Sequence, residues 1–335
     1  MDAKLQELCR QAHEDRIRVG MLDTDTKNRT LELAADALMA HEQEILEANA
    51  IDMERGRERN MPQGLLDRLK LDHDRLLGMA DGLRQVAKLE DPIGEVMSMR
   101  KRPNGLIIGK GIIFEARPNV TSDAFGLCFK SGNCAILKGG SDAIHSNIAI
   151  VSAMQEALRR MNIPKGALSL IESTDRETTN AFMKMKDYVD LLIPRGGRGL
   201  IQSVVNNATI PVIETGTGNC HVYVDQFADQ EMAVNIIKNA KTQRIGVCNA
   251  CESIVVHRAI AKEFLPKLYA ALKEYDVEMR GDSYAVECLG PDQPLVKDAT
   301  EEDWGTEYLD YIMSVKIVDS LDEAIAHINK YNTSH

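Results

Sequence analysis

The chain has 335 residues, 44% hydrophobic and 27% charged, a composition typical of a globular protein and a length that predicts two domains. Its formal net charge of −11 argues against nucleic acid as a general partner, and an anionic substrate would need local cations or main-chain N–H groups to hold it. No apolar run approaches the roughly 20 residues that cross a bilayer, which argues against a membrane protein.

The first 90 residues are predicted to be helical throughout. The N-terminal stretch is an amphipathic, charged helix and lacks the apolar segment of a signal peptide, which indicates a cytoplasmic protein. Residues 23–49 carry the helix-cap candidates Thr24 and Asp25, followed by apolar residues at helical spacing. Two shorter helices are predicted to open at Pro62 and near Asp72.

From about residue 105, short apolar runs alternate with helical segments. The predicted strands are LIIGKGIIFE, NCAILK, YVDLLIP, IPVIE and CESIVVH. The first four end in polar loops, and the fifth leads into a helix from about Arg258. This alternation indicates an α/β fold with a mostly parallel sheet, in which ligands bind at the carboxyl ends of the strands.

Seven cysteines are scattered along the chain, and this low density predicts free thiols rather than a disulfide framework. Cys248 and Cys251 form a C-x-x-C motif. A structural zinc site needs four ligands, and the sequence offers no second pair, so we expect no metal. A thioredoxin-like pair opens a helix after a strand, whereas here a helix precedes the pair and a strand follows it.

Cys248 is also a candidate nucleophile, because the loop QRIGVCNA has Lys241 and Arg244 nearby. Positive charge lowers the pKa of a thiol and increases its reactive thiolate fraction. The residues alone leave open the alternative that this cysteine is a small buried hydrophobic residue.

Other candidates lie where the predicted strands end. The glycine-rich loops KGGSD and RGGRG can present N–H groups to a phosphate, although neither matches G-x-G-x-x-G and turn formation explains them as well. Arg117, Arg195 and Arg198 suit a charged ligand or are solvated loop charges. Asn119 can donate to a developing oxyanion or cap the next helix. Glu214 can be an acid or base, or an ordinary loop carboxylate.

Several segments together resemble one family, the gamma-glutamyl phosphate reductases of the aldehyde dehydrogenase superfamily. They are EARPNVTSD, LCFKSGNCAILKGGSDAIHSN, LLIPRGGRGLI, ATIPVIETGTGNCHVYVD, NAKTQRIGVCNACESIVVH and EYLDYIMSVKIVDSLDEAIAHI. With the helical N-terminus these segments cover nearly the whole chain in order. The combination of EARPNV, IPRGG and NAKTQR followed by a cysteine is highly specific.

The resemblance implies an aldehyde dehydrogenase-like fold, with two Rossmann-like α/β domains of mostly parallel sheets and an N-terminal helical segment. Residues 1–213 would form these helices and the NADP-binding domain, and residues 214–335 the catalytic domain with the nucleophile. Family members have an additional strand-forming segment before GIIFEARPNV and continue beyond INKYNTSH. The resemblance therefore implies a shortened interdomain arm and a catalytic domain that is incomplete at its carboxyl end.

The resemblance also assigns roles to single residues. It makes Cys248 the nucleophile, Asn119 the oxyanion-hole amide and Glu214 a supporting carboxylate. The cofactor would be bound by Lys138, Gly139, Gly140, Arg195, Gly196, Gly197 and Glu307. Lys138 would reach the adenosine ribose, where a 2′-phosphate explains a preference for NADPH over NADH. Arg117 and Arg244 would bind the substrate.

The activity implied is the NADPH-dependent reduction of L-glutamyl 5-phosphate to L-glutamate 5-semialdehyde and phosphate, through a thioester on Cys248. This reaction is the second step of proline biosynthesis from glutamate. The alternatives are a phosphate-independent aldehyde dehydrogenase and a truncated, inactive relative that binds nucleotide or partners. The expected partners are a small-molecule substrate, further copies of the chain in a dimer or tetramer, and a functional link to glutamate 5-kinase.

Overall fold

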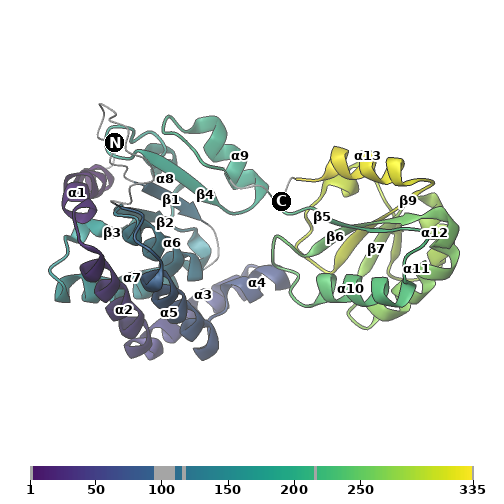
Figure 1. Ribbon diagram of the computed structural model, residues 1–335, viewed down its shortest axis with the longest axis horizontal. Coiled ribbons are helices and arrows are strands. Elements are labelled where there is room, and N and C mark those ends of the chain that lie inside the picture. The colour runs from purple at the N-terminus through teal and green to yellow at the C-terminus, as the bar shows by residue number, and fades with distance from the viewer. Residues whose placement is uncertain (1–2, 94–109, 115–117, 215–216, 334–335) are drawn as a thin grey trace. The chain divides into compact units, whose positions relative to one another are not determined.

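The computed structural model describes residues 3–93, 110–114, 118–214 and 217–333. The chain divides into two compact units. Unit 1 comprises Met1–Met61 and Arg68–Thr215, and unit 2 comprises Pro62–Asp67 and Gly216–His335. Each unit contains its own parallel sheet covered by helices (Figure 1), which confirms the predicted α/β fold class.

The predicted helices of the first 90 residues are confirmed: α1 (Ala3–Gly20), α2 (Thr24–Ala40), α3 (Glu42–Glu58), α4 (Gln63–Leu69) and α5 (His73–Lys88). The cap of α2, however, is Asp23, whose carboxylate accepts a hydrogen bond from the Thr26 N–H at 2.7 Å. The predicted caps Thr24 and Asp25 are wrong, because both residues already lie in the first helical turn. Among the described helices, none combines the length and apolar character needed to cross a membrane.

The sheet of unit 1 has the strand order β3-β2-β1-β4, and all neighbours are parallel. Its strands are β1 (Lys110–Phe114), β2 (Ala135–Lys138), β3 (Leu168–Leu170) and β4 (Leu191–Arg195). The predicted strand at 106–115 is thus seen over 110–114, and its remaining residues lie outside the described ranges. The predicted strand 210–214 is reduced to a single parallel bridge between Leu192 and Val212.

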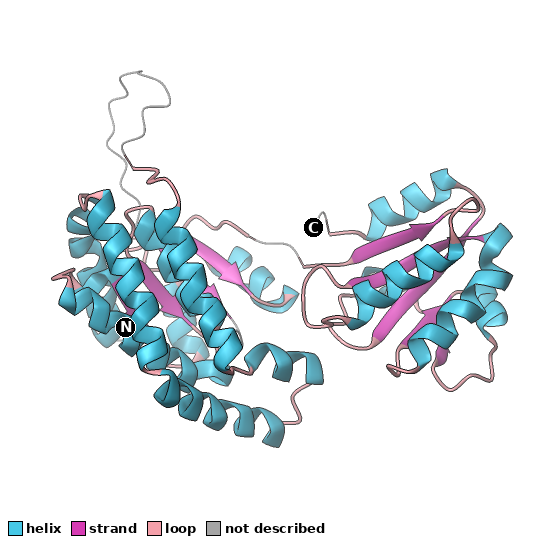
Figure 2. Ribbon diagram, turned by 60° about the horizontal axis from the view of Figure 1, so that its bottom comes forward, coloured by secondary structure: helices cyan, strands magenta, loops and turns pink. Residues whose placement is uncertain are grey.

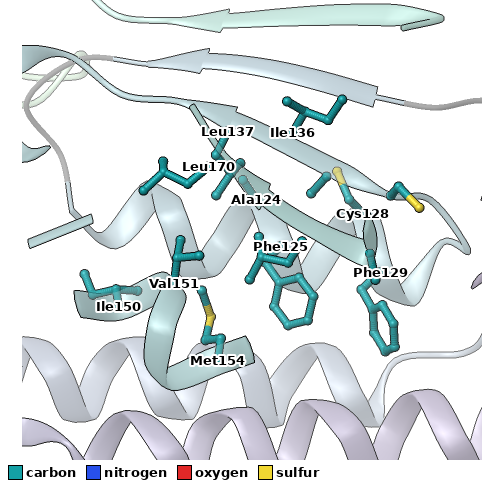
Figure 3. Packing of buried hydrophobic residues seen from close by; sticks show 14 of the residues in the cluster. Ala124, Phe125, Cys128, Phe129, Ile136, Leu137, Ile150, Val151, Met154 and Leu170 are labelled. Atoms are coloured by element: carbon teal, nitrogen blue, oxygen red, sulfur yellow. The ribbon is translucent and has the colours of Figure 1, made fainter. Parts of the chain in front are cut away.

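Helices α6 (Asn119–Lys130) and α7 (Ile144–Arg160) pack between this sheet and the N-terminal helices (Figure 3). The rings of Phe125 and Phe129 stack with their centroids 5.3 Å apart. Gly126 lets α6 approach α5 closely, because a Cβ at this position would lie 2.9 Å from Leu83. The remaining helical elements of the unit are η1 (Ser141–Ala143), η2 (Lys165–Ala167), α8 (Arg176–Phe182) and α9 (Arg198–Asn207).

The sheet of unit 2 has the strand order β5-β6-β9-β7-β8, and all its neighbouring strands are parallel. Figure 2 shows the strands of each unit beside the helices that cover them. Its strands are β5 (Cys220–Val224), β6 (Cys251–His257), β7 (Glu278–Gly281), β8 (Val296–Asp298) and β9 (Ile312–Val318). Its helical elements are α10 (Gln230–Thr242), α11 (Arg258–Lys273), α12 (Ser283–Leu289), η3 (Glu301–Gly305) and α13 (Leu321–Tyr331). The predicted strand CESIVVH and the helix from Arg258 are confirmed to the residue.

Both faces of the unit 2 sheet are covered. Ile254 and Val256 of β6 belong to the main core, together with Phe264 of α11. Val255, between them, belongs to a separate cluster that contains Ala324 of α13. Alternate residues of a strand face opposite sides of the sheet, so α11 and α13 cover opposite faces. This explains why β6 is buried along nearly its whole length.

Candidate active site

The two thiols of the C-x-x-C motif have different surroundings. Cys251 is the first residue of β6 and is 1% exposed. Burial raises the pKa of the Cys251 thiol to about 12, and its Sγ lies 3.4 Å from the Ser253 carbonyl oxygen, to which it donates. Cys248 is half-buried in the loop between α10 and β6. Cys251 is therefore a structural core residue, and Cys248 is the thiol of the pair that a substrate can reach.

The main chain of Cys248 is held by the segment that leads into β5. A Cβ on Gly218 would lie 1.5 Å from the Cys248 carbonyl oxygen, so this close approach requires glycine. The Sγ of Cys220 donates to the same carbonyl oxygen at 3.4 Å. These two contacts fix the backbone from which the candidate nucleophile projects.

A buried ion pair flanks the loop of Cys248. Lys241, near the end of α10, and Glu252, in β6, are both fully buried, and their charged groups lie 2.7 Å apart. The other oxygen of Glu252 accepts the N–H of Leu309 at 3.1 Å. Burial raises the pKa of Glu252 above its usual range, and the Lys241 ammonium opposes this shift. The pair ties both ends of the nucleophile loop to the segment before β9.

Both cations expected near Cys248 are paired with carboxylates. Lys241 pairs with Glu252, and the exposed Arg244 lies 3.2 Å from Asp67, a residue of the 62–67 segment. Asp67 belongs to unit 2 because this segment packs there: a Cβ on Gly64 would lie 2.5 Å from the Leu309 carbonyl oxygen. Arg244 is exposed and paired with Asp67, and its contact with the substrate stays a prediction.

Glu307, a predicted cofactor residue, lies in the same part of unit 2 as Cys248. Its carboxylate accepts the N–H of Gly218 at 3.0 Å, and Gly218 itself packs against Cys248. The half-buried Glu307 thus shares an anchor with the nucleophile loop. Two of the predicted site residues of unit 2 are brought together in this way.

In unit 1, strand register places the predicted residues at one edge of the sheet. Phe114 at the end of β1 pairs with Arg195, and Ile113 pairs with Lys138. The carboxyl ends of β1, β2 and β4 are therefore level. Asn119, which opens α6 after β1, lies at the same edge. This is the edge at which ligands bind in open parallel sheets.

Asn119 does not cap α6, so the alternative prediction that it serves as a helix cap is wrong. The helix has Pro118 at its cap position, and Asn119 is the first helical residue. Its side chain is exposed, and Nδ2 donates to Asp123 Oδ2 at 3.2 Å. An asparagine amide carries two N–H donors, so this bond orients the amide and leaves the second donor for a ligand.

Lys138 is buried at the end of β2, with 4% of its surface exposed. Its ammonium donates to the Gly139 carbonyl oxygen at 2.8 Å. Burial lowers the pKa of Lys138, and the charge of Asp175 opposes this shift. An ammonium group held mainly by a main-chain carbonyl is well suited to bind a further anionic or hydroxyl group.

The two glycine-rich loops both lead into helical turns. Gly140 precedes η1, and Gly197 precedes α9, in each case without a side-chain cap. Their first N–H groups therefore face the same edge as Lys138, where anions are favoured. Arg195 and Gly196 are exposed beside them.

Two predicted residues contribute little to this geometry. Glu214 is exposed and is the last described residue of unit 1. Arg117 lies outside the described residues.

Within the described part of the chain, no cluster of His, Cys, Asp and Glu side chains is arranged to hold a metal ion. All seven cysteines are free thiols, as predicted.

Sequence reasoning missed three residues of this region. Glu252 can be recognised in the sequence as a lone charge within a predicted strand, but its pairing with Lys241 cannot. Gly218 was one glycine among several in TGTGN, and only its approach to Cys248 shows its role. Asp123 follows Asn119 by four residues, a spacing that places both on one helix face.

Comparison with known proteins gives a consistent picture. The model of the aldehyde dehydrogenase family matches residues 2–289. A protein named gamma-glutamyl phosphate reductase from Agathobacter rectalis is 68% identical over 99% of this chain and 81% of its own length. One of the same name from Lachnospira eligens is 57% identical over 94% of this chain and 77% of its own length.

Solved structures agree. The crystal structure of a gamma-glutamyl phosphate reductase from Thermotoga maritima has a TM-score of 0.85 and 46% sequence identity, and it matches 99% of this chain and 81% of its own. An acetylating aldehyde dehydrogenase from Geobacillus thermoglucosidasius, 18% identical with a TM-score of 0.68, shares the fold over 98% of this chain and 79% of its own.

Proposed function

Because the chain belongs to the aldehyde dehydrogenase family and, within it, to the gamma-glutamyl phosphate reductases, we propose that it reduces L-glutamyl 5-phosphate to L-glutamate 5-semialdehyde and phosphate. This reaction is a step of proline biosynthesis. The single observation that carries the proposal is the contrast between the accessible thiol of Cys248, on an anchored loop, and the buried thiol of Cys251.

The chemistry begins at Cys248. Its thiolate attacks the acyl carbon of the acyl phosphate, the carbon–oxygen bond to phosphate breaks, and a thioester forms. Hydride addition converts the thioester into a tetrahedral thiohemiacetal anion, which collapses to the aldehyde and returns the thiolate. A half-buried thiol whose main-chain carbonyl group is held by Gly218 and Cys220 suits this role, because the attacking sulfur must keep one position through both steps.

Asn119 is proposed to stabilise the oxyanion. One of its N–H groups donates to Asp123, and the other is proposed to donate to the oxygen that becomes charged. Such preorganised donors act where charge develops in the transition state, and loss of one commonly costs about 2.7–4 kcal/mol of barrier.

A nicotinamide cofactor is implied by the family, and the edge of the unit 1 sheet suits it. The buried ammonium of Lys138 and the uncapped helical turns after Gly140 and Gly197 provide the donors that phosphate and ribose groups need. When bound, the cofactor supplies the hydride. We propose that Lys138, Gly139, Gly140, Arg195, Gly196, Gly197 and Glu307 hold it, and that Lys138 favours NADPH through the 2′-phosphate.

The remaining predicted residues have lesser roles. Glu214 supports the site but is not required as a base, because no water attacks the thioester in the reductive direction. Arg117 and Arg244 are proposed to bind the anionic substrate. The resemblance to the family also supports a cytoplasmic homo-oligomer, dimeric or tetrameric, with a functional link to glutamate 5-kinase.

The proposal is tested in the reverse direction, with L-glutamate 5-semialdehyde, NADP⁺ and the purified chain. The expected result is NADPH formation that requires inorganic phosphate and yields an acyl phosphate. A rate that is unchanged when phosphate is omitted would instead indicate an oxidising aldehyde dehydrogenase that uses water. Binding of NADP⁺ without turnover under either condition would indicate a relative that binds nucleotide only.

A further inference from the structure

A groove of about 730 Å³ opens in unit 1 between α5, α6 and the end of β4. Most of its lining is apolar, from side chains that include Leu83, Val86, Val120, Leu127 and Ile193. Among the described residues that line it, the charged side chains are those of Asp123 and Arg195. The groove thus combines an apolar wall with one carboxylate and one guanidinium group.

The carboxylate of Asp123 is positioned by Asn119. The two residues are four apart on α6, so their side chains lie on the same face, and Asn119 Nδ2 donates to Asp123 Oδ2 at 3.2 Å. Helix α5 presents a glycine to the other oxygen: a Cβ on Gly82 would lie 3.7 Å from Asp123 Oδ1. Gly82 has no side chain to cover this oxygen, and both Gly82 and Asp123 line the groove.

The charges of the groove are coupled. The surrounding protein displaces water from the Asp123 carboxyl and raises its pKa, whereas the bond from Asn119 and the charge of Arg195 lower it. The Asp123 side chain is nonetheless exposed to solvent, so the displacement of water is only partial. A carboxylate that has lost part of its hydration binds an arriving cation more strongly than a fully hydrated one does.

We infer that Asp123 binds the α-ammonium group of the acyl substrate and so selects a free α-amino acid over an acyl compound without an amino group. The inference rests on the proposed function, which places the reacting acyl oxygen at Asn119. Four helical residues advance by about 6 Å. In L-glutamyl 5-phosphate, three carbon–carbon bonds of about 1.5 Å each separate the acyl carbon from the carbon that bears the ammonium group. This span is comparable to the advance along α6 from Asn119 to Asp123, so a substrate whose acyl oxygen lies at Asn119 can place its ammonium group at Asp123.

Arg195 supplies the opposite charge in the same groove. Its guanidinium group suits the α-carboxylate of the same substrate, because planar carboxylates bind guanidinium groups through two parallel hydrogen bonds. This inference assigns the Arg195 side chain to the substrate in place of the cofactor contact proposed above for this residue, and the other proposed cofactor residues keep their roles. The groove thereby complements both charges of an α-amino acid, and its apolar wall complements the methylene groups.

The test compares two aldehydes that differ by the amino group, L-glutamate 5-semialdehyde and 5-oxopentanoate, each with NADP⁺ and phosphate. The variant is Asp123→Asn, and the matched control is Asp187→Asn, an exposed carboxylate that precedes the amino end of β4. We expect Asp123→Asn to raise KM for the amino aldehyde about 10- to 100-fold and to change KM for 5-oxopentanoate less than about twofold. The control should change neither value.

Other kinetic outcomes would overturn the inference. An equal fall in kcat with both aldehydes would show that Asp123 acts through Asn119 alone and does not bind the ammonium group. Unchanged kinetics with both aldehydes would show that the groove does not hold the substrate. In either case phosphate-dependent turnover by the unmodified chain would leave the proposed function standing.

A binding measurement separates the inference from the proposed function. Calorimetric titration with L-glutamate and with glutarate needs no turnover. Like the two aldehydes, these two acids differ by the α-amino group. We expect the unmodified chain to prefer L-glutamate and Asp123→Asn to lose this preference, even if phosphate-dependent turnover is absent. Equal affinity of the unmodified chain for both acids would overturn the inference.

Discussion

The two sheets carry their candidate functional residues at opposite edges. In unit 1, Asn119, Lys138 and Arg195 lie at the carboxyl ends of parallel strands. In unit 2, the loops of Cys248 and Glu307 precede β6 and β9, and therefore lie at the amino ends. Both sheets are parallel and helix-covered, so fold class alone does not determine which edge is used.

The difference has a physical consequence. At the carboxyl edge of a parallel sheet helices begin, and their N–H groups and positive dipole ends favour anions such as cofactor phosphates. At the amino edge helices end: α10 stops at Thr242, just before the loop of Cys248. A helix end offers carbonyl groups there, so the position of the nucleophile depends on other contacts, namely the Lys241–Glu252 pair and the glycine at 218.

The largest effect is expected from breaking that pair. Lys241→Met leaves the carboxylate of Glu252 buried without its cation, which typically costs 3–5 kcal/mol. The stability of unit 2 should fall by about this amount in urea denaturation. The fluorescence of Trp304 reports it, because Trp304 is the sole tryptophan and lies in unit 2.

The matched control is the double variant Lys241→Met/Glu252→Leu. Replacing both members of a buried pair by apolar residues is often neutral or stabilising, so this variant should recover most of the lost stability. A single variant that loses less than about 1 kcal/mol would show that the pair does not anchor the amino edge.

A somewhat smaller effect is expected at the carboxyl edge. Asn119→Ala should lower kcat by about 10²- to 10³-fold, equivalent to about 2.7–4 kcal/mol, and should leave the urea midpoint of unit 2 unchanged. Asn207→Ala, an exposed asparagine of the same unit in α9, is the control. Full activity in Asn119→Ala would remove the oxyanion role from unit 1.

The smallest effect is a pH dependence confined to unit 2. Burial, together with the charges of His221, Lys316 and Lys330, lowers the pKa of His327 from 6.5 to about 4, and Glu301 opposes this shift. Between these values the unfolded state binds the proton and the folded state does not, so stability decreases as pH falls from 6.5 to 4.

His327→Phe should flatten this dependence while it keeps the ring contacts of His327 with Trp304 and Tyr331. Because the His327 ring is only half-buried, we expect a difference of about 1–2 kcal/mol at pH 4. Urea denaturation at several pH values measures it. Parallel pH profiles of the two proteins would contradict the assignment.

Much of the fold was predictable because its signals are local. The apolar runs NCAILK and CESIVVH each form a strand, and the helix after CESIVVH begins at Arg258 as expected. The cap of α2 was misplaced by one or two residues because Asp23, Thr24 and Asp25 are all acceptable caps in sequence. Only the backbone geometry decides among them: Asp23 is extended, whereas the next two residues are helical.

The candidate site was less predictable because its contacts are not local. The choice of Cys248 over Cys251 came from the resemblance to a family, and burial of Cys251 supports it independently. The sequence predicts that Lys241 is a positive charge near the thiol, but Lys241 forms an ion pair with Glu252 instead. Glu252 is buried because β6 lies between β5 and β9 in the sheet. Likewise, the groove at Asp123 exists because α5 packs beside α6, which no spacing within either helix indicates.

The most direct measurement of the central claim is mass spectrometry of the acyl-enzyme. The chain is mixed with L-glutamate 5-semialdehyde and NADP⁺ without phosphate, quenched in acid and digested. We predict a γ-glutamyl group on Cys248 in the unmodified chain and in Cys251→Ala, and no adduct in Cys248→Ala. A γ-glutamyl group on Cys251, or turnover that persists in Cys248→Ala, would contradict the account.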